Sequence, residues 1–130
     1  MLDTNICIYI IKNHPPKVRQ ILEQKKDFEI VLSTAVVFEL QYGIEKSLAR
    51  EKNQIALEEF LIGFEIATFD RAAATRAASI RAGLERKGTP IGAYDYLIAA
   101  HALELGATLV TNNLKEFRRV QGLHLENWFA

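Results

Sequence analysis

The chain has 130 residues, of which 49% are hydrophobic, so it can form one domain with a buried core but is too short for two ordinary domains. Sixteen Lys and Arg residues balance sixteen Asp and Glu residues, which excludes a protein held to nucleic acid by its overall charge. The single cysteine cannot form an internal disulfide, and no apolar run approaches the ~18 residues of a membrane span, so we expect a cytoplasmic protein without a membrane segment.

Short apolar runs alternate with helical patterns along the chain. In the first half, the periodicity predicts the end of a strand at 1–3, a helix from Ile6 to the break at His14-Pro15-Pro16, a helix at 17–24, a strand at 28–32, and helices at 35–46 and 54–64. In the second half it predicts a strand at 65–69, a helix from Asp70 through 87, a helix at 94–105, a strand at 107–111 and an edge strand at 123–125. Because helices separate the strands, we expect a single α/β domain over residues 1–130, with a central, mostly parallel sheet of four to five strands flanked by helices.

One carboxylate stands at the head of an almost uncharged helix. Asp95 follows a Gly- and Pro-rich turn in the stretch GTPIGAYDYLIAAHALELG, and at 3.6 residues per turn it shares a face with the apolar Ile98. No Lys or Arg occurs between residues 87 and 115, so nothing nearby in the sequence can pair with it. A buried charge must be paired, hydrogen-bonded, metal-bound or neutralised. Taken alone, Asp95 is more simply explained as an acidic residue that the helix dipole favours at a helix start.

Other acidic residues fall where the predicted strands end. Asp3 ends the first strand, Glu39 lies in the opening turns of the helix after the second, and Glu116 begins a short segment after the fourth. In open parallel sheets, ligands bind beyond the carboxyl ends of the strands, where the strand order changes direction. We therefore expect Asp3, Glu39, Asp95 and Glu116 to converge at that edge.

Such a cluster favours a divalent cation. At ~5 Å and an effective dielectric constant near 20, each pair of ionised carboxylates repels by about 3 kcal/mol. Three such pairs would offset a large part of the roughly 5–15 kcal/mol that stabilises a domain. Without a cation, at least one carboxyl group must keep its proton and have a raised pKa. An all-oxygen ligand set suits Mg²⁺ or Mn²⁺, and such an ion can activate water to hydrolyse a phosphodiester bond.

Several motifs in a fixed order carry a resemblance to a known family. The segments are MLDTNICIYIIK, VVFELQYGIEKS, GTPIGAYDYLIAAHALELGATLVTNNLKEF and GLHLENW. Together they resemble a PIN-domain ribonuclease of the VapC toxin type over essentially the whole chain. The resemblance implies a Mg²⁺- or Mn²⁺-dependent endoribonuclease toxin, a hydrolase acting on the phosphodiester bonds of structured RNA such as tRNA.

The resemblance also implies roles for individual residues. It gives Asp3, Glu39 and Asp95 as the metal-binding carboxylates, and it gives a set of polar residues that shape the site: Thr4, Asn5, Thr111, Asn112 and Asn113. Many relatives carry an Asp where this chain has Asn113. Glu116 follows shortly afterwards and is the candidate for the fourth catalytic acid.

Candidate RNA contacts lie beside these positions. Tyr94 stands where relatives commonly carry a small polar residue, so its ring can stack on a base, although a rim or core tyrosine is as good an explanation. Lys115, Arg118 and Arg119 follow the fourth strand and can hold RNA phosphates, although a solvated basic turn explains them about as well.

Two helices carry more apolar surface than one core-facing stripe needs. They span residues 35–48 and 54–64. The resemblance implies that they form a homodimer contact and part of a groove for the C-terminal tail of a VapB-type antitoxin. Such an antitoxin often inserts an Arg among the carboxylates, where a guanidinium relieves the same repulsion as a metal ion.

Two further residues are assigned structural roles. Cys7 lies on a helix of isoleucines and is expected in the core. His101 lies on the helix face opposite Asp95 and is expected to form a surface pair with Glu104, three residues later.

Two other functional classes stay open. One is a catalytically impaired PIN-like module that binds RNA or protein, which the Asn at position 113 permits. The other is a different Mg²⁺ enzyme, such as a phosphatase or a receiver domain. The latter is disfavoured because Asp3-Thr4-Asn5 lacks the second Asp of an Asp-x-Asp nucleophile motif. The sequence also has no Gly-rich loop typical of nucleotide binding.

Overall fold

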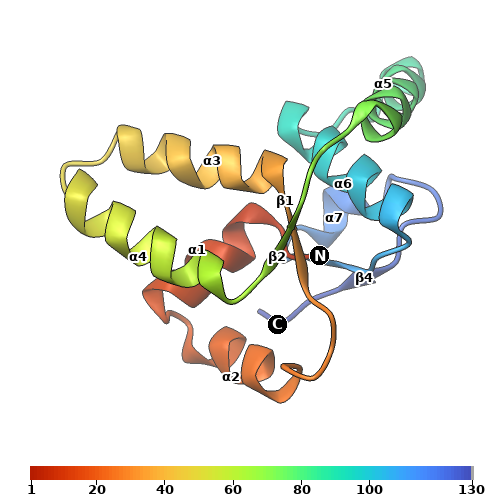
Figure 1. Cartoon of the computed structure of the whole chain (residues 1–130). Helices are drawn as coiled ribbons and strands as arrows, with labels where there is room; N and C mark the ends of the chain where they lie inside the picture. The colour runs from red at the N-terminus through yellow and green to blue at the C-terminus, as the bar shows by residue number, and fades with distance from the viewer. Residues whose placement is uncertain (130) are drawn as a thin grey trace.

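A parallel arrangement of short strands runs through the middle of the molecule, which the computed structural model describes over residues 1–129 (Figure 1). Strand β1 (Val31–Ser33) pairs with β2 (Glu65–Ala67), and β3 (Leu109–Val110) pairs with β4 (Leu125–Glu126). Both pairs are parallel, as the alternation of strands and helices predicted.

The first three residues join these two pairs. The Val110 amide donates to the Met1 carbonyl (2.8 Å), and the Asp3 amide donates to the Val110 carbonyl (3.0 Å). On the other side, the Leu2 amide donates to the Val31 carbonyl (3.4 Å). The order across the molecule is therefore β2, β1, residues 1–3, β3 and β4, with the N-terminus in the middle of Figure 1. The order of the strands along the chain changes direction next to residues 1–3. In such sheets ligands bind beyond the carboxyl ends of the strands at this point, which is where Asp3 lies.

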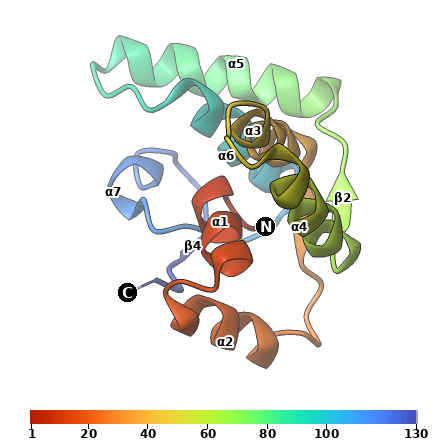
Figure 2. The same ribbon diagram turned by 90° about the vertical axis from the view of Figure 1, so that its left-hand side faces the viewer.

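The helices occupy nearly the predicted positions. Within residues 1–129 they are α1 (Thr4–Lys12), α2 (Pro16–Gln24), α3 (Thr34–Glu45), α4 (Arg50–Ile62), α5 (Arg71–Arg86), α6 (Ala93–Leu105) and α7 (Leu114–Phe117). Figures 1 and 2 show α3 beside α4 and α5 beside α6. The start of α4 was predicted at Gln54 but lies at Arg50, because the charged residues that suggested a connection form an exposed first turn.

Most helix ends follow the expected capping chemistry. Ser33 caps α3 by accepting a hydrogen bond from the Ala35 amide (3.0 Å), and Asp70 caps α5 through the Ala73 amide (2.9 Å). Gly106 closes α6 in the left-handed conformation, with φ of 63°. These caps set where α3 and α5 begin and where α6 ends.

The strands are shorter than the apolar runs that predicted them. Phe28, expected at the start of a strand, is 68% exposed, and β1 begins only at Val31. The core instead comes mainly from helices packed on residues 1–3 and β3, and Cys7 is buried in it as predicted.

The prediction for His101 was wrong. Its side chain is buried, and its Nδ1 atom lies 2.7 Å from the Ser33 hydroxyl, while Glu104 pairs with Arg76 on α5. The reason is that Ser33, at the end of β1, and Phe69, just before α5, cover this face of α6, which was expected to lie in solvent. Although a Ser–His pair can act as a nucleophile and its base, Ser33 and His101 are closed off from solvent, so the pair is structural.

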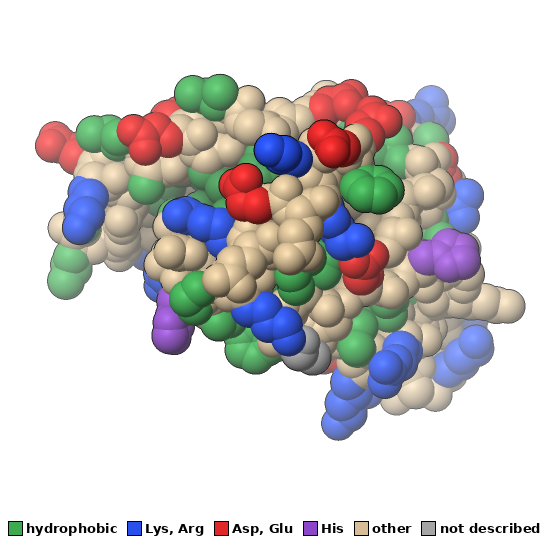
Figure 3. Space-filling model, turned by 90° about the horizontal axis from the view of Figure 1, so that it is seen from below, with side chains coloured by type: hydrophobic (Ala, Val, Ile, Leu, Met, Phe, Trp, Pro, Cys, Tyr) green, Lys and Arg blue, Asp and Glu red, His purple; other side chains and the backbone are tan. Residues whose placement is uncertain are grey.

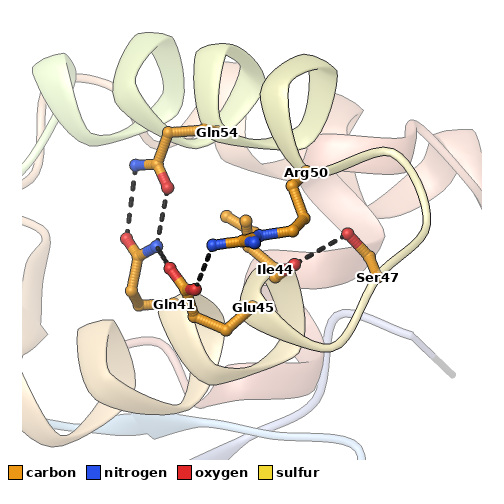
Figure 4. A network of polar contacts seen from close by, with 6 residues as sticks. All are labelled: Gln41, Ile44, Glu45, Ser47, Arg50 and Gln54. Carbon is orange, nitrogen blue, oxygen red and sulfur yellow. Dashed lines mark hydrogen bonds and ion pairs between the residues drawn. The ribbon is translucent and has the colours of Figure 1, made fainter.

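A polar network fixes the corner between α3 and α4 (Figure 4). Gln41 and Gln54 exchange two hydrogen bonds, of 2.6 and 3.2 Å, across the two helices. Arg50 pairs with Glu45 (2.7 Å), and the Ser47 hydroxyl donates to the Ile44 carbonyl (2.8 Å). These contacts therefore hold α3 and α4 in a fixed orientation relative to each other.

The surface has no single dominant charge. On the face seen in Figure 3, Lys and Arg side chains are interspersed with acidic and apolar ones, in agreement with the zero net charge. No helix within residues 1–129 is both long and apolar enough to cross a membrane.

Candidate active site

Four carboxylates from distant parts of the chain lie within each other's electrostatic field. Asp3 precedes α1, Glu39 lies on α3, Asp95 lies in the first turn of α6, and Glu116 lies on α7. The charges of Glu116, Glu39 and Asp3 all raise the pKa of Asp95, and the charge of Glu39 also raises the pKa of Asp3. The structure thus places Asp95 within the electrostatic influence of the other three acidic residues that the strand ends predicted.

Asp3 is held in one orientation at the edge of the sheet. Its side chain is 5% exposed, and its Oδ1 atom accepts a hydrogen bond from the Ile6 amide (2.9 Å), which caps α1. Burial raises the pKa of Asp3. Hydrogen bonds from the Thr111 hydroxyl and from the Ile6 and Asn5 amides act in the opposite direction. The carboxylate is therefore oriented by donors that do not remove its charge.

Glu39 is oriented by the residue next to Asp3. The Thr4 hydroxyl donates to Glu39 Oε1 (2.7 Å), which connects the first turn of α1 to α3. Thr4 thus couples the position of one carboxylate to the chain segment that carries the other.

Asp95 and Glu116 form a close acidic pair. The pKa of Asp95 is raised to about 6, chiefly by burial and also by repulsion from Glu116, Glu39 and Asp3 and by a side-chain hydrogen bond with Glu116. Such a shift marks a carboxyl group whose charged form is disfavoured, which is typical of functional sites and which a nearby cation would relieve. Asn113 orients the partner, because its Nδ2 donates to Glu116 Oε2 (2.7 Å).

Gly92 belongs to the Gly- and Pro-rich turn before α6 and is also part of the site. A Cβ atom on Gly92 would lie 2.8 Å from Asp95 Oδ2, closer than real Cβ contacts. Gly92 is the N-cap residue of α6, so the Asp95 carboxylate folds back over the helix start. The sequence feature that could have indicated this role is the Gly-x-x-Asp spacing of Gly92 and Asp95. It predicts the contact only if the direction of the Asp95 side chain is known.

The predicted site-shaping residues divide into two groups. The first group contacts the cluster and consists of Thr4, Asn5, Thr111 and Asn113. Thr111 and Asn113 are also joined to each other, because Thr111 Oγ1 accepts a hydrogen bond from the Asn113 amide (2.9 Å). Asn112 is exposed, and its side chain accepts a hydrogen bond from Asn127 (3.3 Å).

The candidate RNA contacts also differ among themselves. Tyr94 is 47% exposed and packs against Phe38, with ring centroids 5.5 Å apart. Lys115 and Arg118 are exposed, whereas the Arg119 guanidinium donates to the Pro90 carbonyl (2.7 Å). Contact of these four residues with RNA stays a prediction.

The cluster has the donor chemistry that a hard dication prefers. Among the ion pairs within residues 1–129, none includes Asp3, Glu39, Asp95 or Glu116, so no Lys or Arg neutralises them. Over the same residues, no three His, Cys, Asp or Glu side chains already stand in an arrangement that holds a metal ion. The all-oxygen donor set and the raised pKa values fit Mg²⁺ or Mn²⁺.

Comparison with known proteins identifies the family. Residues 1–123 match the family described as PIN domain. A protein of Salmonella typhimurium named tRNA(fMet)-specific endonuclease VapC is 45% identical over 128 residues, covering 98% of this chain and 96% of that protein. Ribonuclease VapC2 of Rickettsia felis is 48% identical over 129 residues, with the same coverage.

Solved structures agree with the sequence comparison. VapBC2 from Rickettsia felis, bound to a DNA fragment from its promoter, has a TM-score of 0.92 at 46% identity, covering 98% of this chain and 97% of that chain. VapBC-1 from nontypeable Haemophilus influenzae has a TM-score of 0.87 at 32% identity, covering 100% and 98%. The arrangement of the site, the strand order and these similarities lead to one assignment: the chain belongs to the PIN-domain family and, within it, to the VapC type.

Proposed function

We propose that this protein is a Mg²⁺- or Mn²⁺-dependent endoribonuclease that acts as the toxin of a toxin–antitoxin pair. The observation that carries the proposal is the meeting of Asp3, Glu39, Asp95 and Glu116 at one edge of the sheet without a neutralising cation from the protein. Relatives named as ribonucleases over nearly their whole length support nuclease activity.

The metal ion would be held by Asp3, Glu39 and Asp95, with Glu116 beside them. When bound, the ion supplies an activated water and neutralises charge that builds up on the phosphoryl group. The protein's own residues orient the ligands: Thr111 and the Ile6 amide orient Asp3, Thr4 orients Glu39, and Asn113 orients Glu116. With a pKa of about 6, Asp95 holds its proton to a higher pH than an ordinary Asp in the absence of the ion, and binding of the ion would favour the ionised form.

The proposed substrate is structured RNA of the tRNA class. A relative at 45% identity carries the name of a tRNA(fMet)-specific endonuclease. Because the net charge is zero, binding must rest on local contacts, and the exposed Tyr94, Lys115 and Arg118 lie on the segments that carry Asp95 and Glu116.

The proposed protein partner is a VapB-type antitoxin. A groove of about 300 Å³ between α1, α3 and α4 reaches Glu39 and is lined by Ile8, Ile11, Lys12, Glu39, Leu40, Gly43, Ile44, Ser47, Asn53, Ala56 and Leu57. The network of Figure 4 fixes the two helices that form its wall. An apolar tail in this groove, ending in an Arg side chain, would place a guanidinium among the carboxylates. Solved relatives are VapBC complexes, some of them bound to DNA.

The proposed homodimer uses the exposed apolar side chains of α3 and α4 and of the turn between them. These side chains are Phe38, Tyr42, Leu48, Ile55 and Ile62. Their exposure leaves an apolar surface that a second copy of the chain can cover.

Cleavage of an RNA panel that includes tRNA, with and without chelator, tests the function. We expect cleavage of a tRNA in Mg²⁺ or Mn²⁺ and none in EDTA. Binding of RNA without cleavage in either metal would contradict the nuclease and favour an impaired binding module, which the Asn at position 113 permits.

A further inference from the structure

The turn after α7 is tied directly to the turn before α6. Arg119 lies just beyond α7, with its amide donating to the Glu116 carbonyl (3.0 Å), and its guanidinium donates to the Pro90 carbonyl (2.7 Å). Pro90 stands two residues before Gly92, the N-cap of the helix that carries Asp95. One side chain therefore links the segments that carry Glu116 and Asp95.

The segment that Arg119 contacts is hydrogen-bonded to the first turn of α6, which carries Asp95. Ile91 is buried, and its amide donates to the Tyr96 hydroxyl (3.0 Å), which is itself buried. The Gly92 carbonyl accepts a hydrogen bond from the Asp95 amide (3.0 Å). A displacement of Pro90 would therefore be transmitted to the first turn of α6 and to its carboxylate.

Arginine is well suited to this link. Its guanidinium is planar, always charged and able to present several donors in a fixed geometry, whereas a lysine is a flexible point charge. Arg119 is half-buried and already hydrogen-bonded, in contrast to the neighbouring Arg118, which is exposed. The two arginines thus have the same charge and nearly the same place in the sequence but different surroundings.

We propose that Arg119 is a positioning residue of the carboxylate site, which fixes the segments that carry Glu116 and Asp95 relative to each other. This inference rests on the proposed metal-dependent function. Contact of Arg119 with RNA phosphates stays a separate prediction, because only one nitrogen of the guanidinium donates to the Pro90 carbonyl.

The test compares Arg119→Ala with Arg118→Ala, since each variant loses one positive charge at neighbouring positions. Mn²⁺ binding to the metal-free protein is measured by titration calorimetry, and kcat and KM are measured for RNA cleavage. Loss of groups that orient metal ligands typically lowers metal affinity or activity about 10- to 100-fold. We expect Arg119→Ala to lose Mn²⁺ affinity and kcat by that factor with little change in KM. Arg118→Ala should raise KM and its salt dependence, with Mn²⁺ affinity and kcat as in the native protein.

Two additions separate positioning from a general loss of structure. Millimolar guanidinium ion, far below denaturing concentration, should partly restore Mn²⁺ binding to Arg119→Ala and have no effect on Arg118→Ala. Arg119→Lys, which keeps the charge but not the planar donors, should bind Mn²⁺ with intermediate affinity.

The outcomes distinguish the inference from the function on which it rests. Native Mn²⁺ affinity and kcat in Arg119→Ala, or an effect confined to KM and salt dependence, overturns the role of Arg119 while the nuclease stands. Failure of the native protein both to bind Mn²⁺ and to cleave RNA overturns the proposed function, and this inference with it.

Discussion

The Asp95 carboxylate occupies the space that a side chain at Gly92 would need. Its Oδ2 atom lies 2.8 Å from the position of a Cβ on Gly92, so glycine at this N-cap is required by the site rather than by the backbone, whose φ there is −60°. One of the four carboxylates is thereby placed at the start of α6.

The first prediction follows from this contact. Gly92→Ala should fold normally but push the Asp95 carboxylate aside, lowering kcat for RNA cleavage by about 10- to 100-fold. Gly83→Ala on α5 is the matched control, because a Cβ there meets nothing within 4 Å. It should retain full activity and gain roughly 0.5–1 kcal/mol in the free energy of unfolding. Equal kcat for the two variants would contradict the role of Gly92.

The second prediction concerns Asp3. Asp3→Asn keeps a good N-cap for α1 but removes a metal-binding charge, so we expect cleavage to fall by at least about a thousandfold with an unchanged circular dichroism spectrum. Asp70→Asn is the control, since Asp70 caps α5 with the same geometry outside the site. Substantial cleavage by Asp3→Asn would remove Asp3 from the catalytic set.

The third prediction is a pH dependence of stability without metal. The pKa of Asp95 is raised from its ordinary 3.8 to about 6, so between these values the folded protein binds more protons than the unfolded chain. The contribution of Asp95 to stability is therefore present below pH ~4 and is lost as the pH rises through 6.

Urea denaturation in EDTA measures this effect. Asp95→Asn should exceed the native protein in unfolding free energy at pH 7.5, on the order of 1–2 kcal/mol after allowance for solvent screening, with the difference vanishing near pH 4. Asp27→Asn, at an exposed position, is the control. A difference between native and Asp95→Asn that does not change with pH would refute the prediction.

The fourth prediction concerns the buried hydroxyl of Tyr96. Tyr96→Phe leaves the Ile91 amide buried without its acceptor, which should cost about 1–3 kcal/mol in unfolding free energy. Tyr94→Phe, two residues away and 47% exposed, should change it by less than about 0.5 kcal/mol. Chemical denaturation of both variants at one pH provides the comparison, and equal stabilities would show that the Tyr96 hydroxyl contributes nothing.

The convergence of acidic residues was predictable because it depends on topology. Parallel strands end at one edge, and this alone brings Asp3 together with residues that follow other strands. The role of Gly92 and the contact of Arg119 with Pro90 were not predictable, because they depend on side-chain directions that periodicity does not specify. The error for His101 has the same origin: periodicity identifies opposite faces of a helix but not which neighbour covers them.

The place of residues 1–3 in the sheet has a consequence for synthesis on the ribosome. Asp3 precedes all the helices that the structure describes, yet its neighbouring strand contains Val110, more than a hundred residues later in the chain. A nascent chain that has not reached β3 lacks both the Thr111 hydroxyl and Glu116. Since domains fold as units, we expect the carboxylate site to form only after β3 and α7 have been synthesised, so a chain cut short before β3 would lack the complete site.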